Sequence, residues 1–80
     1  MTPEICKAAR ALARLTQRDL AFAADIATPT IADFERGARR PHVNNLKAIA
    51  NVFEDLGIDF VVENEEIVGI DFRNLKSMDA

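Results

Sequence analysis

Residues 17–36 read QRDLAFAADIATPTIADFER, and this stretch decides the fold. Its apolar residues recur at the spacing of two short helices, joined by a three-residue turn. Ala21 is small and stands where two steeply crossing helices would approach most closely. The apolar positions of the shared core are Leu20, Ala24, Ile26, Ile31 and Phe34. The stretch therefore predicts two crossed helices, the second of which can present its outer face to a DNA major groove.

Hydroxyl residues mark where three of the predicted helices begin. Thr2 and Thr28 each precede a proline, which is the pattern of an N-cap followed by the first helical residue. Thr16 stands three residues before Asp19, a spacing that predicts a capping box. We therefore expect Thr28 to cap its helix. The expected helices cover residues 3–14, 17–24, 29–36 and 43–56.

After Gly57 the apolar spacing changes from the helical period to alternation, which is typical of strands. Two strands are expected over residues 58–62 and 68–72, with a polar turn centred on residues 64–66. Because an isolated two-stranded hairpin is marginal in water, its large apolar residues must pack on the helices or pair with a second chain. Both arrangements stay open. The residues concerned are Phe60, Val62, Ile70 and Phe72.

These elements predict a mainly helical protein, with a bundle of four to five short helices followed by a C-terminal β-hairpin. A chain of 80 residues is short enough to form a single unit. We expect a helical domain over residues 1–57, a hairpin extension over residues 58–73 and a flexible tail over residues 74–80.

The net charge of −3 is unevenly distributed along the chain. Residues 1–47 carry eight Lys or Arg and five Asp or Glu, whereas residues 48–80 carry two and eight. This division predicts a basic patch inside an acidic protein.

The composition argues against several classes of function. One cysteine, Cys6, and one histidine cannot supply the ligands of a typical zinc site, and Cys6 is expected to be a packing or surface residue of the first helix. No grouping typical of catalysis is visible, so we expect no enzyme, no cofactor and no small-molecule site. No apolar run approaches the roughly 18 residues of a membrane span, and no secretory signal is evident. The expected location is the cytoplasm, without a membrane partner.

Four segments give the chain a resemblance to the XRE/Cro–C1 repressor family of helix-turn-helix regulators. They are TQRDLA at 16–21, TIADFERG at 30–37, RP at 40–41 and NNLKAI at 44–49. The resemblance covers about residues 3–57, and the hairpin resembles the C-terminal extension of one bacterial branch of single-domain members. It implies a lambda-repressor-like fold. It also implies a transcription regulator that binds operator DNA as a dimer, with a recognition helix at about residues 28–36.

The resemblance further implies which residues contact DNA. Gln17 would lie at the start of the second helix, the residues at positions 27, 28, 29, 32 and 33 would face base edges, and the arginines would approach phosphates. The candidate DNA-binding residues are Gln17, Arg18, Ala27, Thr28, Pro29, Ala32, Asp33, Arg36, Arg39 and Arg40. None of those facing the base edges offers a bidentate contact to guanine or adenine, although the apolar ones suit thymine methyl groups.

Two departures from the family pattern favour a different partner. Asp25 replaces the usual glycine of the turn, where a positive φ is expected, and it adds negative charge near the DNA. Residues 63–66 add three glutamates where relatives are often rich in glycine. The alternative is an antiactivator that keeps the fold, loses operator binding and binds another transcription regulator. The candidate partner or dimer surface is Phe22, Asp25, Phe60, Val62, Ile70 and Phe72, with Phe22 either packed on a neighbouring helix or exposed.

Overall fold

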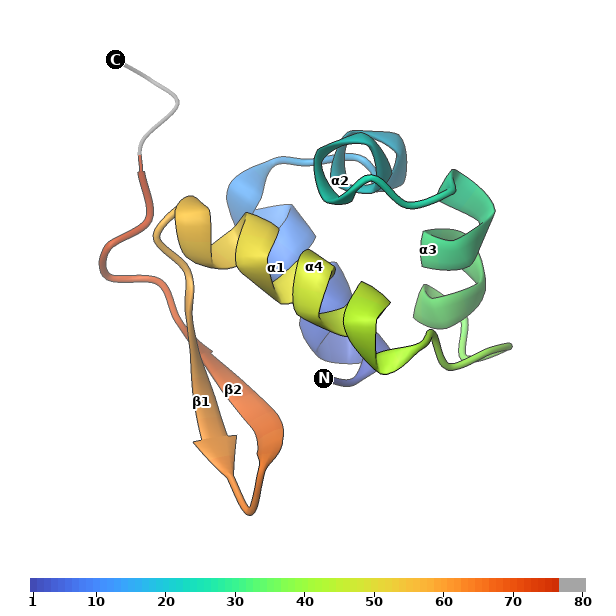
Figure 1. Cartoon of the computed structure of the whole chain (residues 1–80). Coiled ribbons are helices and arrows are strands. Elements are labelled where there is room, and N and C mark those ends of the chain that lie inside the picture. The colour runs from blue at the N-terminus through green and yellow to red at the C-terminus, as the bar shows by residue number, and fades with distance from the viewer. Residues whose placement is uncertain (77–80) are drawn as a thin grey trace.

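The structure is a computed structural model that describes residues 1–76. Within these residues a bundle of four helices is followed by a two-stranded antiparallel hairpin (Figure 1). The helices are α1 (Pro3–Ala13), α2 (Gln17–Ala24), α3 (Thr28–Glu35) and α4 (Val43–Asp55), and the strands are β1 (Asp59–Glu63) and β2 (Glu66–Asp71). The predicted mainly helical fold with a C-terminal β-hairpin is confirmed.

Two of the three predicted helix caps form as expected. The Thr2 hydroxyl accepts a hydrogen bond from the backbone N–H of Ile5. The Thr16 hydroxyl accepts from the N–H of Asp19, whose carboxylate in turn accepts from the N–H of Thr16, which completes the capping box. Each cap satisfies backbone donors that the first turn of a helix leaves without a partner.

The predicted cap at Thr28 is wrong, because α3 begins one residue earlier than the proline signal indicated. Ala27 is the N-cap residue, and its side chain makes no capping hydrogen bond. The N–H of Thr30 donates to the carbonyl oxygen of Ala27 at 3.0 Å, so Thr28 is already the first helical residue. Pro29 then occupies the second helical position, where the missing N–H costs nothing.

The core lies between the helices and closes against the start of the hairpin. Leu20 of α2, Ile31 and Phe34 of α3, and Ile49 and Phe53 of α4 are 0–2% exposed. Cys6 of α1 and Ile58 before β1 are likewise buried, so Cys6 is a packing residue. Burial of these side chains supplies most of the stability of so small a bundle.

The hairpin turn is tighter than predicted. Asn64 and Glu65 form a two-residue turn, both with positive φ, which matches the twist of the flanking strands. The predicted turn therefore extended too far, because Ile67 lies in β2 opposite Val62. A register shift between Val61 and Val62 marks a β-bulge.

One side of the hairpin packs on the helices. Phe60, Ile67 and Ile70 pack against the core, and the Phe60 ring meets that of Phe53 edge to face with 6.3 Å between ring centroids. The other apolar side chains stay in solvent. Val61, Val62, Val68 and Phe72 are 47–56% exposed. Phe72 follows β2 and takes no part in the strand pairing.

The segment after β2 returns to the C-terminal end of α4. Leu75 packs against the core, and the N–H of Lys76 donates to the carbonyl oxygen of Leu56 at 2.9 Å. Gly57 lies beneath this segment with φ +92°, and a Cβ atom there would stand 1.9 Å from the carbonyl oxygen of Asn74. Residues 74–76 of the predicted tail belong to this packed segment, and residues 77–80 lie outside the described residues.

Candidate nucleic-acid interface

The turn between α2 and α3 fixes the crossing of the two helices. Asp25 ends α2 in the left-handed conformation, with φ +57° and ψ +49°. Aspartate tolerates this region better than most residues, which explains how the chain manages without a glycine here. The N–H of Ile26 donates to the carbonyl oxygen of Ala21 at 2.9 Å, and Ala21 is 2% exposed. The small side chain of Ala21 thus allows the turn at residues 25–27 to pack closely against α2.

The outer face of α3 carries the residues assigned to base edges. Ile31, Phe34 and Glu35 are buried on the inner face. On the outer face Ala27 and Pro29 are exposed, and three further side chains are half-buried. The half-buried side chains are Thr28, Ala32 and Asp33. The structure therefore leaves all five residues predicted to face base edges at least partly accessible.

Among the described residues of α3 and its C-cap, Asp33 and Arg36 are the two charged residues whose side chains lie on this outer face. The Arg36 guanidinium donates to the Asp33 carboxylate at 2.6 Å, one helical turn away. The Arg36 side chain is 69% exposed and that of Asp33 is 34% exposed. The pair leaves little net charge on the face, although an exposed pair of this kind is weak.

A buried carboxylate on the inner face of α3 holds three elements together. Arg10 of α1 donates to both carboxylate oxygens of Glu35, with Nε–Oε2 and Nη2–Oε1 distances of 2.7 Å. The Gln17 amide and the Cys6 thiol donate to the same carboxylate at 3.1 and 3.3 Å. Arg10 also donates to the carbonyl oxygen of Leu15 at 2.9 Å. The cluster of Cys6, Arg10, Gln17 and Glu35 thereby joins α1, α2 and α3.

This cluster shifts the pKa values of its members. Burial tends to raise the pKa of the Glu35 carboxyl, but hydrogen bonds from Arg10, Gln17 and Cys6 outweigh it, so that pKa is lowered. Burial, followed by the hydrogen bond to Glu35, raises the pKa of the Cys6 thiol to about 12. Glu35 is therefore ionised at neutral pH, and Cys6 stays a neutral thiol.

Sequence reasoning missed Glu35 and Arg10 and gave Gln17 a role in DNA contact. The Gln17 amide donates to Glu35 and its side chain is half-buried, and its contact with DNA stays a prediction. The helical period could have predicted that Glu35 is buried, because residues 31, 34 and 35 fall on one face of α3. A glutamate on an apolar face requires a buried partner, and that requirement points to an arginine elsewhere in the bundle.

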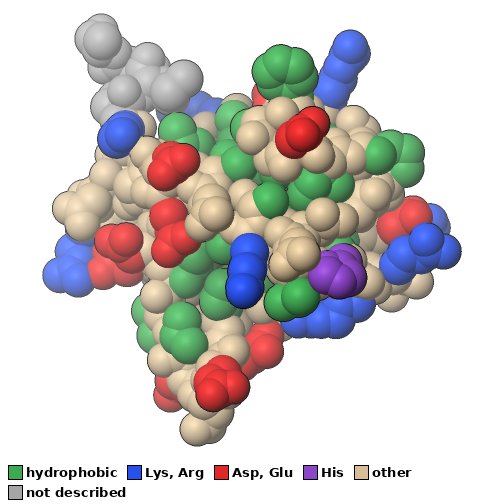
Figure 2. Space-filling model, viewed as in Figure 1, with side chains coloured by type: hydrophobic (Ala, Val, Ile, Leu, Met, Phe, Trp, Pro, Cys, Tyr) green, Lys and Arg blue, Asp and Glu red, His purple; other side chains and the backbone are tan. Residues whose placement is uncertain are grey.

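The loop after α3 carries the basic patch. Gly37 adopts φ +76° and, with Ala38, closes the helix through hydrogen bonds to the carbonyl oxygens of Phe34 and Asp33. Arg39 and Arg40 follow in exposed positions, and Arg40 donates to the carbonyl oxygen of Met1 at 3.2 Å. Figure 2 shows Lys and Arg side chains gathered on the side of α3 and this loop, and Asp and Glu side chains gathered over the hairpin.

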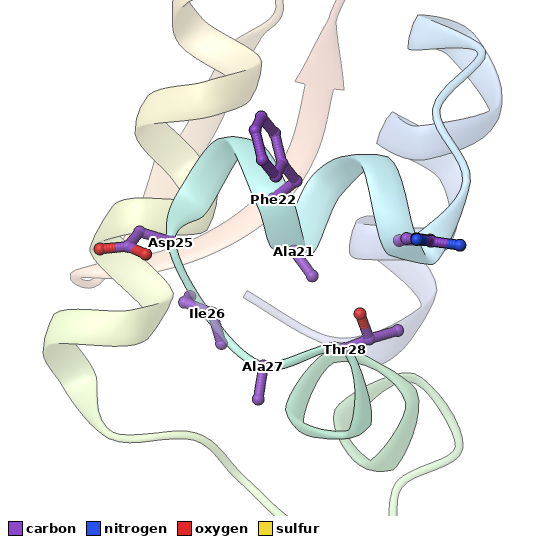
Figure 3. A pocket seen from close by; sticks show the side chains of 7 residues that line it. Ala21, Phe22, Asp25, Ile26, Ala27 and Thr28 are labelled. Atoms are coloured by element: carbon purple, nitrogen blue, oxygen red, sulfur yellow. The ribbon is translucent and has the colours of Figure 1, made fainter.

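A groove of about 620 Å³ opens beside the turn between α2 and α3 (Figure 3). Phe22 stands out from α2 beside it and is 90% exposed, which rules out the prediction that it packs on a neighbouring helix. Asp25 and Arg18 give the groove one charge of each sign. The lining residues are Arg18, Ala21, Phe22, Asp25, Ile26, Ala27 and Thr28.

Comparisons with known proteins address the same part of the chain. A family model described as helix-turn-helix matches residues 7–61. The crystal structure of the wild-type restriction-modification controller protein C.Esp1396I is similar over 65% of this chain and 68% of that chain, with a TM-score of 0.62 and 27% sequence identity. No curated protein matches the sequence. In residues 1–76 no helix is long and apolar enough to cross a membrane.

Proposed function

Because the chain belongs to the XRE-type helix-turn-helix family of DNA-binding transcription regulators, we propose that it places α3 in the major groove of operator DNA. Its proposed form is a homodimer in the cytoplasm, without catalytic activity. The recognition helix extends from residue 28 to 36, and the candidate contacts on it are those of the outer face of α3. In this geometry the side chains on the outer face meet base edges, and flanking groups meet the phosphates.

The observation that carries the proposal is the arrangement of arginines around the outer face of α3. Arg18 comes from α2, Arg36 ends α3, and Arg39 and Arg40 lie in the loop that follows. All four are exposed. Guanidinium groups are suited to phosphate oxygens, and such contacts fix the position of a protein on DNA without reading its sequence.

Binding is tested first by selection from a library of random duplexes, and then by titration of the selected duplex. Arg39→Ala should weaken binding to the selected duplex and to an unrelated duplex by similar factors, since a phosphate contact carries no sequence information. Arg73→Ala is the matched control. It also removes one exposed guanidinium, but from the segment after β2, where Arg73 is paired with Asp71. Equal effects of the two variants would argue against the proposed interface.

The exposed apolar residues of the hairpin form the proposed dimer interface. Val61, Val62 and Val68 lie in the two strands, Phe72 follows β2, and all four side chains are about half exposed. Apolar groups gathered in this way mark an interaction surface. We assign a second copy of the chain to it, because a symmetric DNA site requires two reading helices.

The dimer is tested by sedimentation of two matched variants. Phe72→Glu should give a folded monomer, because it places a charge in the proposed interface. Phe22→Glu makes the same change at an exposed phenylalanine outside the hairpin and should leave the dimer intact. Circular dichroism checks that both variants stay folded. The assignment would be overturned if the parent chain sedimented as a monomer. It would also be overturned if Phe22→Glu dissociated the dimer and Phe72→Glu did not.

A second candidate function is binding to another transcription regulator as an antiactivator. The observation that favours it is Phe22, which is 90% exposed beside a groove that also holds Asp25. An exposed aromatic side chain beside a concave surface is typical of protein-binding sites. In a promoter assay this function predicts that Phe22→Ala abolishes the effect of the chain, whereas Arg39→Ala leaves it intact. The DNA-binding function predicts that Arg39→Ala has the larger effect.

A further inference from the structure

We propose that the chain recognises its DNA through the methyl groups of thymine, and not through hydrogen bonds to guanine or adenine. The inference rests on the proposed placement of α3 in the major groove. It concerns which chemical groups of the bases the helix can read there. In that groove thymine alone among the four bases presents a methyl group.

The outer face of α3 is short of hydrogen-bonding groups. Ala27, Pro29 and Ala32 expose only carbon atoms of their side chains. Thr28 adds one methyl and one hydroxyl, and because Ala27 is the N-cap residue, neither group is engaged in capping. None of these four side chains can form the paired hydrogen bonds that distinguish guanine or adenine.

Three charged or amide groups near this face, those of Gln17, Asp33 and Arg36, are engaged within the chain, and Arg18 and Arg39 are assigned to phosphates. The Asp33 carboxylate accepts from Arg36 at 2.6 Å, and this pair, although weak, must open before Arg36 contacts a base or a phosphate. The Gln17 amide, which could otherwise pair with adenine, donates to Glu35 at 3.1 Å. Since Glu35 is buried and ionised, withdrawing Gln17 would remove one of its donors. What remains for base recognition is an apolar surface bordered by phosphate-binding arginines.

The inference predicts the composition of the bound sequence. Duplexes selected from a random library should contain T·A pairs at the positions that face Thr28 and Ala32. Replacing a contacted thymine by uracil removes only the C5 methyl and should weaken binding about fourfold, the factor expected for one buried methyl group. Uracil placed at thymines outside the contacted positions is the control and should have no effect.

A second substitution separates the methyl group from the identity of the base. Exchanging the contacted T·A pair for a C·G pair should lower affinity. Placing 5-methylcytosine at the same position should restore part of it, because the methyl group returns to the same place in the groove while the hydrogen-bonding pattern remains that of C·G. An equal affinity for cytosine and 5-methylcytosine would contradict the inference.

Variants of Thr28 supply the matching change on the protein. Thr28→Val keeps the methyl group and replaces the hydroxyl by a second methyl, whereas Thr28→Ser keeps the hydroxyl and removes the methyl. On thymine DNA Thr28→Val should bind as the parent chain does, and Thr28→Ser should bind about fourfold more weakly. On uracil DNA the difference between Thr28→Ser and the parent should shrink, because the contact is already lost.

The outcomes distinguish this inference from the function on which it rests. Failure to bind any duplex would overturn both. Tight, sequence-selective binding that is unaffected by uracil at every position would overturn the thymine inference and leave the DNA-binding function standing. A loss confined to a few thymines, together with the weaker binding of Thr28→Ser, would support it.

Discussion

Replacing Arg10 by methionine should lower the free energy of unfolding by about 3–5 kcal/mol, because it leaves a buried carboxylate without its cation. Arg10 donates two hydrogen bonds of 2.7 Å to Glu35, whose side chain is 3% exposed. The Leu15 carbonyl oxygen would also lose the guanidinium that donates to it. A domain of this length is stabilised by roughly 4–12 kcal/mol in all, so the change would remove a large part of its stability.

The reasoning is checked by two companion variants. Arg10→Met combined with Glu35→Leu should be more stable than Arg10→Met alone, since an apolar pair carries no unpaired charge into the interior. Arg73→Met removes an arginine whose side chain is 87% exposed in its pair with Asp71, and it should cost less than about 1 kcal/mol.

Urea unfolding followed by circular dichroism measures all of these variants. The sequence has neither tryptophan nor tyrosine, so fluorescence offers little signal. The free energy of unfolding of each variant is obtained by linear extrapolation to zero urea. The comparison requires that the variants share the same dependence of this free energy on urea concentration. The account of the cluster would be refuted if Arg10→Met were no more costly than Arg73→Met, or if the double variant were less stable than Arg10→Met.

Three further predictions concern pH and backbone geometry. The lowered pKa of Glu35 means that its contribution to stability is complete above about pH 4.5 and is lost as the pH falls through the folded-state pKa. The parent should therefore lose more stability on acidification than Glu35→Gln, which urea midpoints between about pH 3 and about pH 6 would test. Asp25→Gly should be at least as stable as the parent, and Asp25→Val should be less stable by about 1–2 kcal/mol, because a β-branched residue is strained at φ +57°; thermal unfolding compares them. Gly57→Ala should be more destabilising than Gly37→Ala, since both positions have positive φ but only the Cβ at Gly57 would meet backbone, at 1.9 Å; melting temperatures should separate the two variants.

Local signals in the sequence were sufficient for most of the fold. Thr2 and the capping box at Thr16 mark helix starts because they act within one turn of the chain. The change of apolar period after Gly57 predicted the hairpin for the same reason. Asp25 was expected at a positive φ, and its φ is +57°. Each of these features depends on residues close in sequence, where spacing determines geometry.

Most features that the sequence left open depend on contacts between distant segments, and the geometry of the hairpin is a local exception. Glu35 and Arg10 are 25 residues apart, and no local pattern pairs them. The strand register could not be fixed, because a bulge near Val62 shifts the pairing, and Asn64-Glu65 lacks the glycine that usually marks such a turn. The exposure of Phe22 likewise follows from which face of α2 meets the core.

The salt dependence of DNA binding is the measurement that tests the central claim most directly. If four arginines on each of two subunits contact phosphates, up to about eight counterions are released, and the logarithm of affinity should fall with the logarithm of salt concentration with a slope of up to about −7. Titration of the selected duplex at several salt concentrations gives this slope. A steep slope, made shallower by Arg39→Ala, is the predicted result. Absence of duplex binding even at low salt, or an affinity that does not change with salt, would contradict the claim.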